Sequence, residues 1–435
     1  MMKVYRWEEM SGEEKNKLLK RCEQDIKELE AAIRPVVEGV RAGGDGAVAR
    51  FTRQFDGVDL KPSQFRVKKK DFDVAEKKVS PKVKKAIEKA VANVRAYHEK
   101  QMPAPFWLTP VEEGVFAGEK ITPVPACGLY VPRGKGSFPS VMVMLGVPAV
   151  VAGVERAVAV TPPGPGGEFD AATLVAARRC GVEELYRVGG AQAVAALAFG
   201  TGVLPKVDKI VGPGSGYVSA AKRLLYGQVD VGLPAGPSES IILTDSTTDP
   251  ELAALDLLIE AEHGPDSAAL LVSDSEKVIN KAAAALPALV KKLPEPRRSF
   301  VKTGLSRYGG AVLTGSPEES VDFVNLFAPE HLEILTADPF DTMLKIKNAG
   351  EMLLGPCTPI TLGNFCLGVD AILPTGGFAR SFSGVTVFDF LKRTSVGYAT
   401  KAGFDALSPA AKTLADYEGF PAHAMALSER WKKRS

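Results

Sequence analysis

The feature that most constrains the fold is a repeated alternation of short apolar segments with helical segments, from about residue 127 to residue 354. For example, the apolar segments 156–161 and 209–211 are followed by the helical patterns 170–180 and 217–226. Strands and helices that alternate at such short spacing are typical of a parallel sheet with crossover helices. Because the alternation starts again near residue 240, we predict an α/β protein with two doubly wound domains of the dinucleotide-binding type.

The rest of the chain is predicted to be helical or loop-rich. Ser80-Pro81 begins a helix that should reach about residue 100, with His98 near its end as a histidine on a charged face. Pro35 should interrupt an earlier helix. Gly, Pro and Thr clusters after Gly355 indicate loops, and residues 406–434 should form a last helical part. We therefore expect a helical N-terminal element and a small C-terminal element beside the two sheets.

Composition excludes several classes of protein. The 435 residues are 45% hydrophobic and 24% charged, which indicates an ordinary globular protein with more than one domain. A net charge of +2 argues against a nucleic-acid binder. No apolar run approaches the roughly 20 residues of a membrane span, and the first residues lack the apolar core of a signal peptide. The cysteines share no zinc-ribbon spacing, so we expect a cytoplasmic protein with reduced thiols at Cys22, Cys127, Cys180, Cys357 and Cys366.

Three glycine-rich turns follow predicted strands, at 132–134, 189–191 and 212–216. Such turns let backbone N–H groups approach a phosphate at a helix N-terminus. None of them is a complete dinucleotide fingerprint, and the turn at 212–216 lacks the downstream acidic residue. Each turn alone is better explained as an ordinary tight turn, but together they indicate the ligand-binding edge of an open sheet.

The chain has four histidines, and two of them directly follow a glutamate. Glu330-His331 lies between a helix and a strand, where a histidine can accept a proton from an alcohol and a carboxylate can activate water. A capping histidine beside a solvent-facing glutamate is an equally good interpretation of that segment. Glu260 and His263 share one face of a helix, which suits a shared metal ion. A half-buried histidine at a helix end is the alternative there.

Six motifs together resemble the histidinol dehydrogenase family, in the order expected of that family. They lie at residues 211–218, 235–239, 261–264, 328–332, 373–375 and 418–423. The resemblance implies oxidation of L-histidinol through an aldehyde to L-histidine, with two NAD and one zinc or similar divalent ion per site. It also implies a homodimer in which the C-terminal tail crosses to complete the partner's site.

The resemblance also assigns roles and domains. Glu330 and His331 match the catalytic positions, and Ser238 and Glu418 match substrate-contacting positions. The metal positions are Glu260, His263, Asn364 and His423, and the cofactor-contacting positions are Tyr130, Gln192 and Ser215. The implied domains are a first α/β domain (25–129 with 239–385), a second (130–238), a small helical element (1–24 with 386–399) and a C-terminal module (400–435).

Several positions depart from the family pattern. The family usually has Gln in place of Glu260 and Asp in place of Asn364, so a carboxylate and an amide have changed places without altering the charge of the ligand set. Ala371 follows Asp370 where the family has Asn-His, and the histidine there contacts substrate. Leu145 and Ser215 each stand in place of an Asn.

Since specificity for a polar substrate depends on pairing its polar groups, these changes suggest a relative with another small polar alcohol, such as an amino alcohol or a sulfonated diol, as the alternative to histidinol. A non-catalytic binding protein is disfavoured because Glu330, His331, His263 and His423 are all retained.

Overall fold

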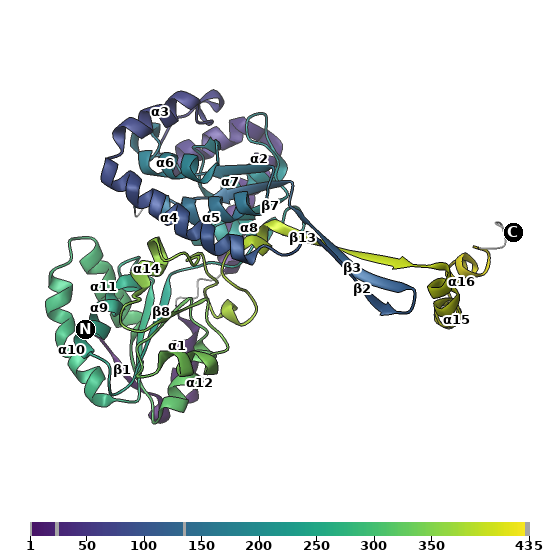
Figure 1. Ribbon diagram of the computed structural model, residues 1–435. Coiled ribbons are helices and arrows are strands. Elements are labelled where there is room, and N and C mark those ends of the chain that lie inside the picture. The colour runs from purple at the N-terminus through teal and green to yellow at the C-terminus, as the bar shows by residue number, and fades with distance from the viewer. Residues whose placement is uncertain (1, 22–25, 134–135, 431–435) are drawn as a thin grey trace. The chain divides into compact units, whose positions relative to one another are not determined.

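The computed structural model describes residues 2–21, 26–133 and 136–430 (Figure 1). The chain divides into two compact units. The first comprises Met1–Gln101 and Val124–Phe390, and the second comprises Met102–Pro123 and Leu391–Ser435. Each unit is described by itself below. Within the described ranges, no helix is both long and apolar enough to cross a membrane.

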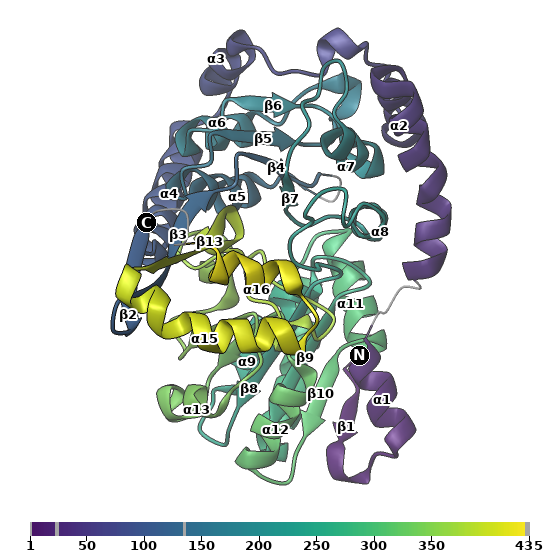
Figure 2. The ribbon, with the colours of Figure 1, turned by 90° about the vertical axis from the view of Figure 1, so that its right-hand side faces the viewer.

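The larger sheet of the first unit has six parallel strands in the order β1-β10-β9-β8-β11-β12. Figure 2 shows β8, β9, β10 and β1 side by side. The strands are β1 (Val4–Arg6), β10 (Gly310–Leu313), β9 (Ala268–Ser273), β8 (Glu239–Thr244), β11 (His331–Ile334) and β12 (Glu351–Leu354). Its helices are α1 (Gly12–Lys20), α9 (Pro250–Ala261), α10 (Glu276–Lys291), α11 (Arg297–Arg307), α12 (Pro317–Phe327), α13 (Pro339–Lys345) and α14 (Ile360–Phe365).

Both faces of this sheet are covered. Ile242 of β8 packs into a core with α9, α10 and α11, whereas its neighbours Ile241 and Leu243 pack into a second core with α1 and α12. Because successive strand residues point to opposite faces, a strand covered on both sides becomes a continuous apolar run. That is the pattern from which the sequence predicted a doubly wound sheet, and the prediction is confirmed.

The smaller sheet of the first unit has four parallel strands in the order β6-β5-β4-β7 (Figure 2). They are β6 (Glu184–Tyr186), β5 (Arg156–Val160), β4 (Ala126–Tyr130) and β7 (Lys209–Val211). The helix α2 packs on α7 and α8, and α5 packs on α4 and α6, which also contacts α3. These helices are α2 (Ile26–Asp56), α3 (Lys69–Lys78), α4 (Pro81–Gln101), α5 (Pro139–Val151), α6 (Ala171–Cys180), α7 (Gly190–Phe199) and α8 (Gly216–Leu224). The predicted alternation of strands and helices is confirmed here as well.

The second unit is an antiparallel ribbon followed by two helices (Figure 1). Its strands lie in the order β13-β3-β2 and are β2 (Phe106–Glu112), β3 (Val115–Pro123) and β13 (Leu391–Ala399). The helices are α15 (Lys401–Tyr417) and α16 (Pro421–Ser428). Residues 391–399, expected within a small helical element, are therefore a strand, because β13 pairs along its whole length with the distant strand β3.

Two local expectations were wrong. Pro35 lies inside α2 without interrupting it. The break in that helix occurs at Gly44, with φ of 50°, a backbone conformation that glycine adopts readily. His98 is completely buried rather than on a charged face, and its Nδ1 lies 2.8 Å from the Val94 carbonyl oxygen. The helix that carries it begins at Pro81, as predicted.

Candidate active site and cofactor pocket

The predicted catalytic pair lies at the amino-terminal ends of the strands of the six-stranded sheet, called the amino edge below. The helix α12 ends at Ala328, which adopts a left-handed conformation with φ of 52°, and Pro329 then directs the chain into β11. His331 is the first residue of β11, opposite Ser240 of β8 and Glu351 of β12. Both His331 and Glu330 are buried, at 3% and 8% exposure. The alternative of a solvent-facing glutamate is therefore excluded.

The His331 ring is surrounded by carboxylates. Its Nδ1 lies 2.5 Å from Glu351 Oε1, and its Nε2 lies 3.9 Å from Glu260 Oε1 and 3.8 Å from Glu330 Oε1. Burial acts to lower the pKa of His331, but Glu260, Glu330 and Glu351 outweigh it and hold the pKa above its ordinary value. Burial also raises the pKa of Glu330 well above its ordinary value, which makes this carboxylate a stronger base.

The predicted metal-binding side chains of the first unit are in contact with one another. Glu260, in the last turn of α9, is completely buried, and its Oε1 accepts a hydrogen bond of 2.8 Å from Asn364 Nδ2. Its Oε2 lies 3.4 Å from His263 Nδ1, and that ring nitrogen lies 3.1 Å from Ser238 Oγ. The two positions where a carboxylate and an amide have changed places are thus hydrogen-bonded to each other.

The donor set fits a divalent cation. Two ligands that are each about 2.1 Å from a tetrahedral zinc ion lie about 3.4 Å apart, the observed separation of Glu260 Oε2 and His263 Nδ1. Among the described residues, Glu260 Oε2 has no hydrogen-bond partner of normal geometry, although it is buried. Burial acts to raise the pKa of Glu260, but His263, His331 and Asn364 outweigh it and hold the pKa below its ordinary value. The carboxylate is therefore available as a ligand.

These side chains alone do not complete a metal site. In the part of the chain that the structure describes, no three His, Cys, Asp or Glu side chains are grouped closely enough to hold a metal ion. The amide of Asn364 and a further ligand would be needed, since zinc in proteins takes four ligands. His423 and Glu418 belong to the second unit, where the His423 ring lies tilted beside Phe420 at 5.2 Å between ring centres and Glu418 directly follows α15. Their roles stay predictions.

The sequence interpretation missed two buried acids of this cluster. Glu351 contacts His331, and Glu239 pairs with Arg21 at 3.2 Å and accepts a hydrogen bond from the Gly376 N–H. Burial raises the pKa of Glu239 to about 7. An acid at the first position of a strand that is otherwise apolar was a visible signal at both positions. The strand register, which places Glu351 opposite His331, was not visible.

The predicted cofactor residues gather at the carboxyl edge of the four-stranded sheet. Tyr130 ends β4, Ser215 precedes α8, and both line a cavity of about 520 Å³ with Gly190 at the start of α7. The Tyr130 hydroxyl accepts a hydrogen bond of 2.9 Å from the Gly190 N–H. The glycine-rich turns at 189–191 and 212–216 follow β6 and β7 at one edge of this sheet, whereas Gly134 of the turn after β4 lies outside the described residues.

Asp56 is an acidic residue of this cavity that the sequence interpretation missed. It ends α2, lines the cavity, and accepts a hydrogen bond of 3.3 Å from Gln192 Nε2. The buried Gln192 therefore reaches the cavity through Asp56. Burial raises the pKa of Asp56 to about 6. No local signal marked this residue, because it lies in a helix far from the glycine-rich turns.

Two of the positions that depart from the family pattern lie on or next to the helix α5. Leu145 is fully buried on α5, and the Ala371 N–H points to the sulfur of the adjacent Met144 at 3.4 Å. Asp370 is buried, with its carboxylate 3.8 Å from the His98 ring. At two positions where the resemblance implies an amide and an imidazole, this chain therefore has a buried leucine and a small alanine.

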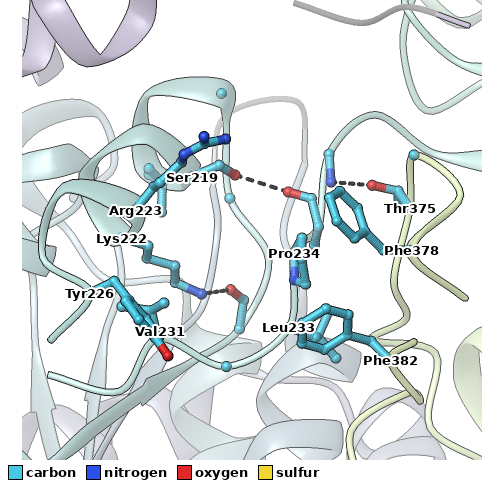
Figure 3. A pocket seen from close by; sticks show the side chains of 18 of the residues that line it. Ser219, Lys222, Arg223, Tyr226, Val231, Leu233, Pro234, Thr375, Phe378 and Phe382 are labelled. Atoms are coloured by element: carbon cyan, nitrogen blue, oxygen red, sulfur yellow. Dashed lines mark hydrogen bonds between the residues drawn. The ribbon is translucent and has the colours of Figure 1, made fainter. Parts of the chain in front are cut away.

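A larger cavity of about 1180 Å³ lies behind the glycine-rich turn (Figure 3). Lys222 is buried and donates to the Gly212 carbonyl, and burial lowers its pKa to about 8. Ser219 Oγ donates to the Ala235 carbonyl, and the Gly236 N–H donates to Thr375 Oγ1 (Figure 3). These bonds hold the segment that leads to Ser238. None of the predicted site residues lines this cavity.

Comparisons with known proteins agree with this architecture. The family model for histidinol dehydrogenase matches residues 19–431. Histidinol dehydrogenase from a Synechocystis strain is 53% identical over 430 residues, which are 99% of each chain. A histidinol dehydrogenase homolog from Rhizobium meliloti is 50% identical over 98% of this chain and 93% of its own. The crystal structure of histidinol dehydrogenase from Elizabethkingia anophelis superposes with a TM-score of 0.93 at 32% identity, covering 99% of this chain and 98% of that one. The chain therefore belongs to the histidinol dehydrogenase family and is an oxidoreductase that acts on an alcohol.

Proposed function

We propose that this protein oxidises a primary alcohol through an aldehyde to a carboxylate, with NAD as oxidant and a divalent metal ion, and that L-histidinol is its substrate. One observation carries the proposal. The predicted base His331 and the predicted water-activating acid Glu330 lie buried beside Glu260, which contacts the two other metal positions of the first unit.

The proposed roles follow from the chemistry of each group. His331 accepts the proton of the alcohol, and Glu330 takes a proton from the water that attacks the aldehyde. When bound, NAD supplies the hydride acceptor and the metal ion supplies a positive charge that polarises the oxygen of the substrate. One alcohol, one water and two NAD⁺ give one carboxylate, two NADH and three protons.

The remaining assignments come from the resemblance and from the family. Glu260, His263, Asn364 and His423 are proposed as metal ligands, with Ser238 and Glu418 at the substrate. Tyr130, Gln192 and Ser215 are proposed at the cofactor, and the cavity that they approach supports this assignment. The homodimer, the four-part division into domains and the cytoplasmic location remain predictions from the sequence.

A second substrate class is kept because of the contact between the segments around Leu145 and Ala371. A substrate site with Leu145 and Ala371 in place of an amide and an imidazole would pair the polar groups of histidinol less completely. Another small polar alcohol, such as an amino alcohol or a sulfonated diol, is therefore the alternative substrate.

The deciding experiment is a panel of small primary alcohols, including L-histidinol, assayed with NAD and zinc. Two reduced NAD per alcohol consumed would support the complete oxidation, and one would limit the reaction to the aldehyde. Turnover of another alcohol far above that of histidinol would select the alternative substrate. If no alcohol reduces NAD, the proposed function is wrong.

A further inference from the structure

We propose that Glu351 is a positioning residue for His331, and that it fixes the tautomer and the ring orientation that a base at His331 requires. This inference rests on the proposed role of His331. Nothing in the sequence pattern singled out Glu351; the evidence is the position of its carboxylate in the fold.

Strand pairing places Glu351 beside His331. The two residues are register partners on the adjacent parallel strands β11 and β12, and each is the first residue of its strand. Glu351 Oε1 lies 2.5 Å from His331 Nδ1, and both side chains are buried. Neither group can exchange this contact for water, so the contact persists as long as the two strands stay paired.

The surroundings leave room for this carboxylate. A Cβ atom added at Gly363 would lie 3.0 Å and 3.1 Å from the two Glu351 oxygens. The backbone of Gly363 is not in a left-handed conformation, so the lack of a side chain there serves space rather than backbone geometry. Any larger residue at position 363 would push the carboxylate away from the ring. The absence of a side chain at Gly363, the residue before Asn364, thus leaves the space that the Glu351 carboxylate occupies.

The contact determines which ring nitrogen is available for chemistry. A carboxylate only accepts hydrogen bonds, so Nδ1 must carry a proton and donate it to Glu351. In the neutral ring, Nε2 is then unprotonated, and this nitrogen faces Glu260 and Glu330 at 3.9 Å and 3.8 Å. Once Nε2 has taken the proton of the alcohol, the adjacent carboxylate stabilises the positive ring.

Glu351 is dedicated to this contact. Among the described residues its second oxygen, Oε2, has no hydrogen-bond partner although it is buried. A buried carboxylate with a single partner lowers the stability of the fold, and an apolar residue would fill the same place without that cost. Its retention at the start of an otherwise apolar strand is explained by the histidine that it holds.

Glu333 provides a matched control. It lies two residues beyond His331 on the same strand and is completely buried, but its partners are Asp256 and the Ile360 N–H. Burial raises the pKa of Glu333 to about 9, so its carboxyl group is protonated at neutral pH. The substitution Glu333→Gln therefore preserves its charge, whereas Glu351→Gln removes one.

The test compares Glu351→Gln with Glu333→Gln in the full-length protein loaded with zinc. Glu351→Gln should lower kcat by about 10²- to 10⁴-fold, as expected when a histidine base loses the carboxylate that orients it, with the KM for NAD unchanged. The acidic limb of its kcat/KM profile should move to lower pH, because the carboxylate no longer favours the charged ring. Glu333→Gln should keep the wild-type profile. Equal kcat and equal pH profiles for wild type and Glu351→Gln would overturn the proposal.

A measurement without turnover separates this proposal from the proposed function. In ¹⁵N-histidine spectra the four rings are few enough to assign with His331→Asn, and the His331 Nδ1–H proton should resonate far downfield in the wild type. This resonance should be lost in Glu351→Gln and kept in Glu333→Gln. If no alcohol is oxidised but the resonance behaves in this way, the positioning contact stands and the proposed function fails. A neutral ring with its proton on Nε2 would refute the contact itself, even if Glu351→Gln does not fold.

Discussion

The two sheets of the first unit carry their candidate sites at opposite edges. The candidate catalytic cluster lies at the amino edge of the six-stranded sheet, where α9 and α12 end close to Glu260 and Glu330. The candidate cofactor cavity lies at the carboxyl edge of the four-stranded sheet, where α7 and α8 begin. Helix C-termini carry partial negative charge and N-termini carry partial positive charge. One edge therefore suits a cation and a protonated histidine, and the other suits the phosphates of a dinucleotide.

The two candidate sites also differ in the chemical groups that line them. At the amino edge, buried side chains with shifted pKa values surround His331. At the carboxyl edge, the helices α7 and α8 begin beside glycine-rich turns, and Asp56 is the acid that lines the cavity. Side-chain changes should therefore affect chemistry strongly at the first edge and cofactor affinity moderately at the second. The following predictions test that contrast.

The largest effect is expected at His331. His331→Ala should lower kcat by about 10²- to 10⁴-fold, because a general base contributes that much. Its affinity for NAD, measured by calorimetry, should stay within about twofold of the wild-type value, since His331 is not part of the cofactor cavity. Unchanged turnover would remove His331 from the chemistry, and weakened NAD binding would contradict the separation of the two edges.

Metal binding should also depend on the amino edge. The wild-type protein should hold about one zinc or similar ion per chain. Glu260→Ala should weaken metal affinity by at least about 10- to 100-fold, the loss known for changes next to a metal. The neighbouring Glu262→Ala is the control, because it removes a carboxylate from the same segment that is not a proposed metal ligand. Elemental analysis after dialysis measures the metal content of each variant. Equal metal content in Glu260→Ala and Glu262→Ala would refute the role of Glu260 as a ligand.

A smaller effect is expected in the cofactor cavity. Asp56→Ala should raise the KM for NAD by about tenfold, with kcat nearly unchanged. That factor corresponds to the free energy of one hydrogen bond to a charged group. The exposed Asp59→Ala is the matched control. Steady-state kinetics with varied NAD distinguish the two, and a fall in kcat without a change in KM would mean that Asp56 acts on the chemistry instead.

The smallest effect concerns stability. The pKa of Asp56 is about 6 in the folded protein and 3.8 when unperturbed, so its ionisation opposes folding. Its stabilising contribution is fully present below pH 3.8 and is lost as the pH rises through 6. Asp56→Asn should therefore unfold at higher denaturant concentration than wild type at pH 8, by about 1 kcal/mol after allowance for solvent screening. The difference should vanish near pH 4, and a constant difference at both pH values would exclude titration of Asp56 as the cause.

Much of the fold could be predicted because the information was local. Strands such as β8, covered on both faces, appear as apolar runs, and Pro81 marks the start of α4 by its fixed backbone angle. The strand 391–399 could not be predicted, since it is stabilised by pairing with β3, far away in the sequence. His98 was misplaced for the same reason, because its burial depends on helices and loops that pack around α4.

By itself the sequence determined the α/β alternation, the glycine-rich turns, and the family motifs with Glu330 and His331 side by side. These features depend on residues close together in the chain. Only the tertiary structure decided that Glu351 lies on His331, that Asp56 lines the cofactor cavity, and that Glu260 and Asn364 are hydrogen-bonded. The physical reason is strand register and helix packing, which bring together residues whose separation along the chain carries no sign of their contact.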